Sequence, residues 1–420
     1  MNLLIKSAIL IDKKSPLHNK KRDILIEKGV ITKIATSIKT EKKIKELKLP
    51  NLHVSVGWFD TSVSFGEPGY EERETIENGL QTAAKSGFTA IALNPITHPI
   101  TDNRASIEYL KSKSQACATD LFPIGSLTKK AEGTEMAELY DMQQAGAIAF
   151  GDYKRAINNP ILLKVSLQYA QAFDGLIMSF PQENLIANKG IANESETTIR
   201  FGLKGNPSLA EELQIIRDLY LIEYTGGKLH IPTISTAKSV KLIKEAQKKG
   251  LAVTCSVSAH HLTLTDVELA SFNSNYKVLP PLRTQKDLNA LRKGVKEGTI
   301  SCVTSDHQPL DIENKKKEFA HAKSGTIGLE SMFGAVNSVL ELNDYIESIT
   351  NKPRSIFGID ELLIKEGEKA NLTFFNPNSE WTFTDENILS NSKNAAFLGK
   401  KLKGKAYGIF NNNQLILGDS

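Results

Sequence analysis

The feature that most constrains the fold is a repeated alternation between apolar runs and helix-period segments across residues 54–345. Strand-like runs such as FTAIALNP and LAVTCSVS alternate with segments such as ETIENGLQTAAKSG and SVKLIKEAQKKG, in which apolar residues recur at helical spacing. Repeated β-then-α units over a stretch of this length are typical of a (β/α) barrel. The sequence therefore predicts an α/β chain with a (β/α)8 TIM-like barrel over residues 54–345.

Both ends of the chain have a different pattern. Residues 1–53 contain NLLIKSAILID and RDILIEKGVITKIA, and residues 365–420 contain KANLTFFNP and KAYGIFNNNQLILG. Short β-rich runs separated by turn signals predict antiparallel strands. We expect residues 1–53 and 365–420 to join in one small β-sandwich beside the barrel.

Composition and charge exclude several functional classes. The 52 basic and 48 acidic residues give a net charge of +4, and no run of like charge is long enough for a nucleic-acid groove. No apolar run reaches the roughly 18 residues of a membrane span, and the N-terminus meets charge too early for a signal peptide. The three cysteines, Cys117, Cys255 and Cys302, form no C-x-x-C pair, which favours reduced thiols. We expect a cytoplasmic protein that binds neither nucleic acid nor membrane.

Candidate site residues are sought at the carboxyl ends of the predicted strands, where barrel enzymes place their chemistry. The first such stretch is VGWFDTSVSFGEPGY, residues 56–70, which contains Asp60, Ser62, Ser64 and Gly66. Further along, AFGDYK contains Asp152, and TSDHQP contains Asp306 and His307.

These stretches resemble the dihydroorotases, a family of the amidohydrolase superfamily. The family pattern D-x-H-x-H-x-R-E-P-G, with its E-T and G-F-T continuation, is matched at Glu67-Pro68-Gly69, Glu74-Thr75 and Gly87-Phe88-Thr89. The segments KVLPPLR, TSDHQP and GTIGLE follow in the family's order, so the resemblance covers nearly the whole chain. It implies a barrel that binds zinc and hydrolyses or closes a cyclic amide.

The chain departs from the family at its functional positions. The resemblance places the four metal histidines on Ser62, Ser64, Ser179 and Thr233. It places the substrate arginine on Gly66, two substrate asparagines on Ile96 and Leu279, and a late histidine on Leu310. The bridging carboxylate falls on Asp152 or on its neighbour Tyr153, and Asp306 survives at the general-base position.

The loss of these side chains has a chemical consequence. Serine and threonine hydroxyls are poor neutral ligands for zinc, which takes about three protein ligands in a catalytic site. Without zinc, the attacking water keeps a pKa near 15.7 instead of about 7, which forfeits roughly 12 kcal/mol of nucleophile preparation. We therefore predict no zinc cofactor, with Asp152 as a surviving carboxylate and Asp306 as a vestigial general base.

The leading interpretation is a catalytically inactive dihydroorotase-like protein. The resemblance to inactive homologues implies a homodimer and a structural role beside aspartate carbamoyltransferase, the preceding enzyme of pyrimidine biosynthesis. One alternative is an active cyclic-amide hydrolase that uses Asp152, Asp306 and a rearranged metal site, and another is a metabolite-binding sensor. The pair His260-His261 is interpreted as structural, on the expectation that both lie on a strand and point to opposite faces. Cys255 and Cys302 are expected to be buried small hydrophobes.

Overall fold

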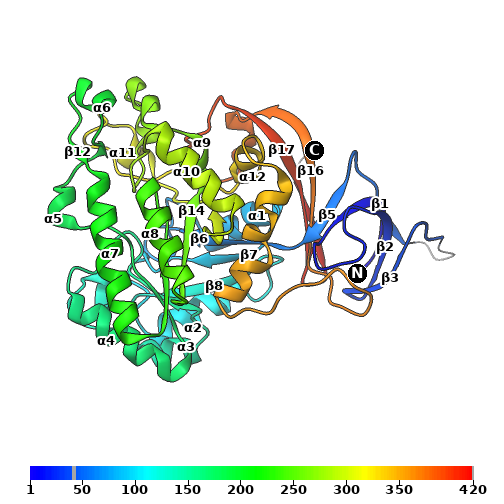
Figure 1. The fold of residues 1–420 in the computed structure, drawn as a ribbon. Coiled ribbons are helices and arrows are strands. Elements are labelled where there is room, and N and C mark those ends of the chain that lie inside the picture. The colour runs from blue at the N-terminus through cyan, green and yellow to red at the C-terminus, as the bar shows by residue number, and fades with distance from the viewer. Residues whose placement is uncertain (40–43, 419–420) are drawn as a thin grey trace.

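A computed structural model describes residues 1–39 and 44–418. It contains a barrel of parallel strands surrounded by helices and a separate sheet built from both chain ends (Figure 1). The predicted fold class is confirmed. Residues 40–43 and 419–420, which belong to the two predicted terminal segments, lie outside the described residues.

Eight strands form the barrel, and they pair in parallel in the order of the chain. They are β6 (Trp58–Val63), β7 (Phe88–Leu93), β8 (Asp120–Gly125), β9 (Ala149–Phe150), β10 (Leu176–Met178), β13 (Lys228–Ile231), β14 (Val253–Ser258) and β15 (Cys302–Thr304). Just after β15, His307 forms a parallel bridge with Val63 at the end of β6. This bridge brings the last strand back to the first and nearly closes the barrel.

Helices cover the outside of the barrel. The longer ones are α1 (Ile76–Lys85), α2 (Arg104–Ser114), α4 (Pro160–Ala170), α7 (Ser208–Thr225), α8 (Ala237–Lys248) and α10 (Gln285–Lys296). Shorter helices and one small two-stranded sheet lie in the loops: α3 (Leu139–Gln144), α5 (Asn184–Ala187), α6 (Glu196–Arg200), α9 (Ala259–Thr263), α11 (Ile312–Lys315), α12 (Met332–Asn337), α13 (Leu342–Tyr345), α14 (Asn351–Ile356), β11 (Ala192–Asn193) and β12 (Gly205–Asn206).

Several helices begin at residues whose side chains satisfy free N–H groups. Thr75 accepts a hydrogen bond from the Asn78 amide at the start of α1, and Thr284 and Asp287 form a reciprocal capping box at the start of α10. Caps of this kind contribute about 1 kcal/mol each. No helix among the described residues has the length and apolar character that a membrane crossing requires.

The second sheet contains strands from both chain ends. Its path is β18 (Gln414–Leu417), β17 (Lys401–Asn411), β16 (Leu372–Thr382), β5 (His53–Val56), β1 (Asn2–Ile11), β2 (Lys21–Glu27) and β3 (Val30–Ala35), with β4 (Lys45–Leu47) beside β1. The antiparallel pairing of β5 with β16 joins the two ends of the chain. We call this the terminal sheet.

Aromatic packing connects the terminal sheet to the barrel. Trp58, the first residue of β6, is fully buried, and its ring centroid lies 5.4 Å from that of Phe375 in β16 and 4.6 Å from that of Phe333 in α12. Its indole N–H donates to Ser55. Fully burying side chains of this size stabilises the fold by a few kcal/mol each. The barrel and the terminal sheet therefore share one core at this junction.

Candidate functional site

Asp60 closes the barrel at the first strand and does not point to an open site. Its carboxylate accepts hydrogen bonds from the Thr304 hydroxyl of β15, from the Ser305 amide at 3.0 Å and from the Ser62 amide at 3.1 Å. Complete burial raises the pKa of Asp60 to about 6. The aspartate of the first-strand motif therefore joins β6 to the end of β15.

The two serines of the same motif share one amide. Asn94, which follows β7, donates from its side chain to Ser62 Oγ at 3.2 Å and to Ser64 Oγ at 3.1 Å. All three residues are buried. The positions on which the resemblance puts two metal histidines are thus occupied by two hydroxyls that share the Asn94 amide. This role of Asn94 was not predicted from the sequence.

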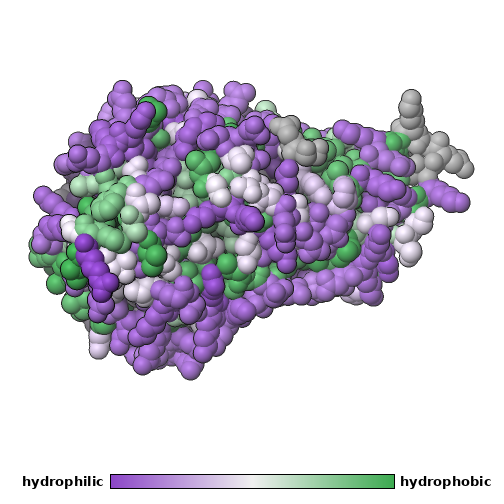
Figure 2. Space-filling model, turned by 90° about the horizontal axis from the view of Figure 1, so that it is seen from above, coloured by the Kyte–Doolittle hydropathy of each residue, from purple (hydrophilic) through white to green (hydrophobic). Residues whose placement is uncertain are grey.

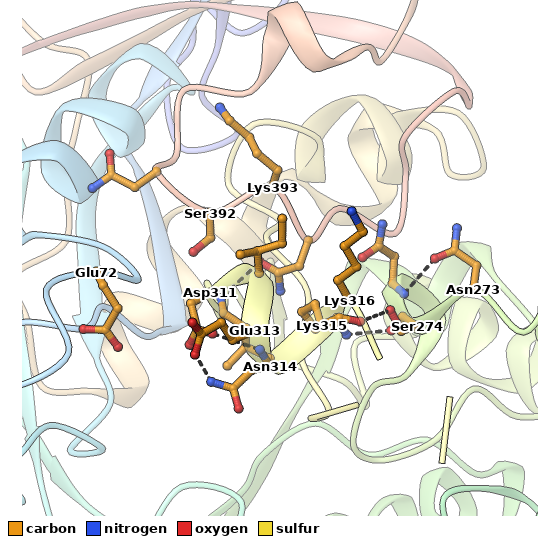
Figure 3. A pocket seen from close by; sticks show the side chains of 15 residues that line it. Glu72, Asn273, Ser274, Asp311, Glu313, Asn314, Lys315, Lys316, Ser392 and Lys393 are labelled. Atoms are coloured by element: carbon orange, nitrogen blue, oxygen red, sulfur yellow. Dashed lines mark hydrogen bonds between the residues drawn. The ribbon is translucent and has the colours of Figure 1, made fainter. Parts of the chain in front are cut away.

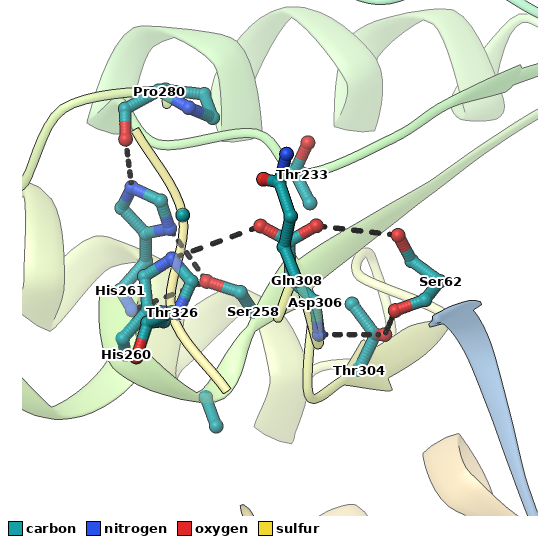
Figure 4. A network of polar contacts seen from close by, with 12 residues as sticks. Ser62, Thr233, Ser258, His260, His261, Pro280, Thr304, Asp306, Gln308 and Thr326 are labelled. Carbon is teal, nitrogen blue, oxygen red and sulfur yellow. Dashed lines mark hydrogen bonds and ion pairs between the residues drawn. The ribbon is translucent and has the colours of Figure 1, made fainter. Parts of the chain in front are cut away.

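Asp306 is the charged centre of the barrel mouth (Figure 4). One carboxylate oxygen lies 2.8 Å from the ammonium of Lys154, and the other accepts from the Tyr153 hydroxyl at 3.1 Å and from Ser62 at 3.3 Å. The side chains of Lys154 and Asp306 are 9% and 1% exposed. The two charges of this buried ion pair cancel, so the barrel mouth carries no net charge from them. The family resemblance implies a metal ion at this place.

Asp152 faces away from this ion pair. Its carboxylate accepts hydrogen bonds from the Ser126 hydroxyl at 2.7 Å, the Thr128 amide at 3.0 Å and the Thr128 hydroxyl. Burial raises its pKa above the ordinary value. The next side chain, Tyr153, takes the place that faces Asp306. Asp152 therefore anchors the loop after β8.

The Ser179 side chain also bonds away from Asp306, and Thr233 is held through its backbone. Ser179 Oγ donates to Asp218 of α7 at 2.6 Å, and the Thr233 amide donates to Ser256 at 3.1 Å. The barrel mouth thus brings together Ser62 and Asp306 directly, with Ser64 linked through Asn94. No hydrogen bond or ion pair of the described residues connects Ser179 or Asp152 to Asp306.

Three of these strand-end residues have strained backbones. Tyr153, Thr233 and Asp306 have positive φ values of 55°, 49° and 51°. A left-handed conformation costs a residue with a Cβ about 1–2 kcal/mol, and such strain is concentrated at functional sites. The barrel mouth therefore has the strained backbone that is common at functional sites.

The histidine pair lies on a helix, which corrects the expectation that it lies on a strand. His260 and His261 are in α9, directly after β14, with ring centroids 4.6 Å apart. His261 Nε2 donates to the Pro280 carbonyl and its Nδ1 accepts from Ser258, and burial lowers its pKa to about 3. His260 Nε2 lies 3.9 Å from Asp306, beyond hydrogen-bond distance.

His307 acts as a loop anchor. Its Nδ1 accepts from the amides of Gly328 and Leu329 at 3.1 and 3.4 Å, and burial lowers its pKa to about 3. Cys255 and Cys302 are fully buried in β14 and β15, and burial raises the pKa of the Cys255 thiol to about 12. None of these groups is an available base or nucleophile.

The loop after β6 leaves no room for a side chain at Gly66, the position on which the resemblance places the substrate arginine. A Cβ atom on Gly66 would lie 1.7 Å from the carbonyl oxygen of Tyr70. The turn is fixed by hydrogen bonds from the Gly66 amide to Glu74 and from the Tyr70 amide to Gly66. Any larger side chain at this position, arginine included, requires a different loop.

The space left at the barrel mouth is very small. The cavity lined by Ser62, Asn94, Tyr153, Lys154 and Thr233 has a volume of about 10 Å³, and a single water needs about 10–15 Å³. A much larger cleft of about 990 Å³ lies between α11 and residues 391–394 (Figure 3). Leu310 lines that cleft, but Asp306, Ser62, Ser64, Ser179 and Thr233 do not.

The donor set does not fit the zinc ion that the resemblance implies. Among residues 1–39 and 44–418, no three His, Cys, Asp or Glu side chains form a group that could hold a metal. The cation of Lys154, 2.8 Å from Asp306, would repel a second cation at that carboxylate. Sequence reasoning missed Lys154, and it named Tyr153 only as the alternative to Asp152 at the bridging position, without its hydrogen bond to Asp306. The only signal was their position directly after the β9 run, in AFGDYK.

Comparisons with known proteins agree on the family. Residues 53–239 match the family model described as dihydro-orotase-like. A dihydroorotase from Syntrophus aciditrophicus is 35% identical over 96% of both chains, and one from Ruminiclostridium cellulolyticum is 37% identical over 96% of both chains.

Solved structures with the same fold include hydantoinases. The L-hydantoinase from Arthrobacter aurescens matches with a TM-score of 0.86 and 21% identity over 99% of this chain and 96% of that chain. A D-hydantoinase matches with a TM-score of 0.83 and 19% identity over 100% of this chain and 96% of that chain. These two likenesses concern the fold. With full-length relatives above 30% identity, the chain belongs to the dihydroorotase family.

Proposed function

We propose that this chain is a catalytically inactive dihydroorotase-like protein with a structural role in pyrimidine biosynthesis, as a partner of aspartate carbamoyltransferase. The observation that carries the loss of activity is the buried ion pair of Lys154 with Asp306, 2.8 Å apart, at the centre of the barrel mouth. A carboxylate neutralised by an ammonium and bonded to two hydroxyls is not free to take a proton from water.

The chemistry of the remaining side chains supports the same proposal. Hydrolysis of an unactivated amide needs a strong nucleophile, and metal-bound water supplies one at neutral pH. Positioned acid–base groups alone contribute typically about 10²–10⁴-fold. Four buried histidines of the barrel, His230, His260, His261 and His307, are held in the neutral form by burial, which lowers the pKa of each. The ring nitrogens of His230, His261 and His307 form hydrogen bonds with other protein groups.

The size of the barrel-mouth cavity argues against a sensor that binds its ligand at the barrel mouth. Small-molecule sites usually have volumes of about 300–1,000 Å³, whereas the barrel mouth retains about 10 Å³. A cyclic ureide such as dihydroorotate does not enter a space of one water molecule. The partner itself is proposed from the family resemblance to inactive homologues.

The test of lost activity is an assay of dihydroorotate hydrolysis and cyclisation, with and without added zinc or manganese, alongside metal analysis of protein purified without chelator. We expect turnover at the uncatalysed background and less than one equivalent of tightly held zinc. The double variant Ser62→His with Ser64→His should also stay inactive, because Lys154, Gly66 and Thr233 are unchanged. Metal-dependent turnover by the unmodified chain overturns the proposal and favours a rearranged metal site.

A further inference from the structure

A segment between β16 and β17 reaches from the terminal sheet to the barrel mouth. Residues 388–394, which we call the strap, belong to the connection between these two strands. Asn394 donates to the carbonyls of Gln308 and Gly325 at 3.0 and 3.2 Å. Residues 391–394 also form one wall of the cleft of about 990 Å³ (Figure 3). The position of the strap therefore determines how far this cleft is open.

Two glutamates hold three consecutive amides of the strap. Glu330, two residues before α12, accepts from the amides of Leu389 and Ser390 at 3.2 and 3.0 Å. Glu74, two residues before α1, accepts from the amide of Asn391 at 3.0 Å. Because neighbouring amides bind different carboxylates, the strap brings the two acids close together.

The hydrogen-bond donors that these two carboxylates have among the described residues are all neutral. Besides the strap amides, they are the Asn78 side chain, 2.8 Å from Glu74, and the Ser390 hydroxyl, 2.6 Å from Glu330. The second oxygen of Glu330 is buried and has no donor in the described part of the chain. Neighbouring carboxylates disfavour each other's ionisation. A proton held between the pair would relieve the repulsion and supply the missing donor.

The other charged side chains around the pair come from the loop before α1, from α1, from the β16–β17 connection and from β17: Arg73, Lys85, Glu386, Lys393 and Lys405. Lys393 donates to two carbonyls of the strap, both at 3.0 Å, and the Arg73 guanidinium lies 3.9 Å from the ring centroid of Tyr70. The remaining three line a pocket of about 110 Å³ beside Glu330. Glu74 is fully buried, and burial together with the charge of Glu330 raises its pKa to about 7.

We propose that Glu74 and Glu330 form a proton-controlled clasp, which holds the strap closed while Glu74 is protonated and releases it when Glu74 ionises. An ionised carboxylate is more stable in water than buried beside a second carboxylate. The side of the molecule on which α11 lies in Figure 1 is mostly hydrophilic in Figure 2, so a released carboxylate is hydrated there. The clasp controls access to the cleft, and it works in the same way whether or not the chain has lost its activity.

The test is hydrogen exchange of the full chain at pH 5, 7 and 9, measured by mass spectrometry on the peptide that contains the strap and corrected for the intrinsic exchange rates. The pKa of Glu74 is about 7 in the closed state and returns toward its ordinary 4.5 when the strap opens. The opening equilibrium should therefore rise about 40-fold between pH 5 and 7, and only about twofold between pH 7 and 9. Strand β13 is the internal reference for global unfolding, which the buried histidines favour at low pH instead.

Three variants separate the clasp from other causes. Glu74→Gln cannot ionise, so the protection of the strap should no longer change between pH 5 and 7. Glu330→Gln removes the neighbouring charge and should move the midpoint of opening to lower pH. Glu268→Gln is the matched control, because Glu268 pairs with Lys400 at 2.8 Å at the far end of the same connection, and it should leave the pH profile unchanged.

Two results overturn the proposal. One is strap protection in the unmodified chain that stays constant between pH 5 and 7. The other is protection that changes with pH in Glu74→Gln as much as in the unmodified chain, which would assign the titration to a different group.

Discussion

At the scale of single residues, Lys154 and Tyr153 satisfy the buried carboxylate of Asp306 at the barrel mouth. Asp306 remains buried, and a buried carboxylate requires a cation or several hydrogen-bond donors. Lys154 supplies the cation and Tyr153 supplies a donor. Burial and the neighbouring charge of Asp306 raise the pKa of Tyr153 well above its ordinary value, so its hydroxyl stays protonated and can donate.

The first prediction concerns this ion pair. Lys154→Met should lower the free energy of unfolding by about 3–5 kcal/mol, because it leaves the Asp306 carboxylate buried without its counter-ion. Adding Asp306→Asn to Lys154→Met should recover most of the loss, because the remaining charge is removed. The measurement is urea denaturation followed by fluorescence or circular dichroism.

The control for this prediction is Lys228→Met. Lys228 pairs with Asp174 at 2.6 Å on the surface, where the two side chains are 45% and 81% exposed. Exposed pairs contribute about 0–1 kcal/mol, so this variant should be nearly neutral. A Lys154→Met protein that is as stable as the Lys228→Met control would show that Asp306 finds another partner.

At the scale of the elements, the strands and their loops are held by polar groups that the family pattern retains. Arg283, in the segment KVLPPLR, is buried and donates to Ser235, to Asn193 and to the Asn206 carbonyl. It ties the loop after β13 to the small sheet of β11 and β12. The retained arginine is therefore explained by loop anchoring, which does not require a substrate.

The second prediction concerns strand β13. His230 is fully buried, contacts the hydroxyls of Thr254 and Ser256, and has a pKa lowered by burial to about 3. Between pH 6.5 and 3 the unfolded imidazole takes up a proton that the folded one does not. The free energy of unfolding therefore falls by about 1.4 kcal/mol per pH unit as the pH falls through this window. Above pH 6.5 this group has no effect on stability.

His230→Gln removes this titration. The variant should be less stable than the unmodified chain at pH 7.5, because it loses buried hydrogen bonds, and this deficit should shrink by roughly 2 kcal/mol at pH 5. Urea midpoints at the two pH values measure the difference. His321→Gln, at an exposed histidine, is the control and should show the same deficit at both pH values. A constant deficit for His230→Gln would show that the ring is protonated in the fold.

At the scale of the whole molecule, the overall shape has been kept although the site has been filled. The Trp58 cluster still joins the barrel to the terminal sheet, and full-length relatives match over 96% of the chain. Under the proposal of lost activity, the fold is expected to work through its surfaces. This is the basis for proposing a carbamoyltransferase partner.

The third prediction tests this partner. Tagged protein should co-purify with aspartate carbamoyltransferase from the same cell at micromolar concentration, as expected for an interface that buries upwards of about 1,200 Å². Asp306→Asn should not change the amount recovered, because Asp306 is 1% exposed inside the barrel mouth. If the carbamoyltransferase is absent from the purified material and assembles fully without this chain, the structural role is wrong.

The sequence alone determined the architecture and predicted which metal-ligand positions carry other residues. Hydrophobic periodicity of strands and helices is a local property, so the barrel and the β-rich ends could be predicted from it. The resemblance located the substitutions at Ser62, Ser64, Ser179 and Thr233, because residue type at an aligned position needs no structure.

Only the tertiary structure decided which side chains contact one another at the barrel mouth. Whether Asp152 or Tyr153 faces Asp306, and whether Lys154 reaches it, depends on backbone angles and on contacts between strands more than 150 positions apart. The closure of the loop at Gly66 and the helical placement of His260 likewise follow from long-range packing. Such contacts leave no periodic pattern in the chain, because each joins residues that are close only after the barrel has formed.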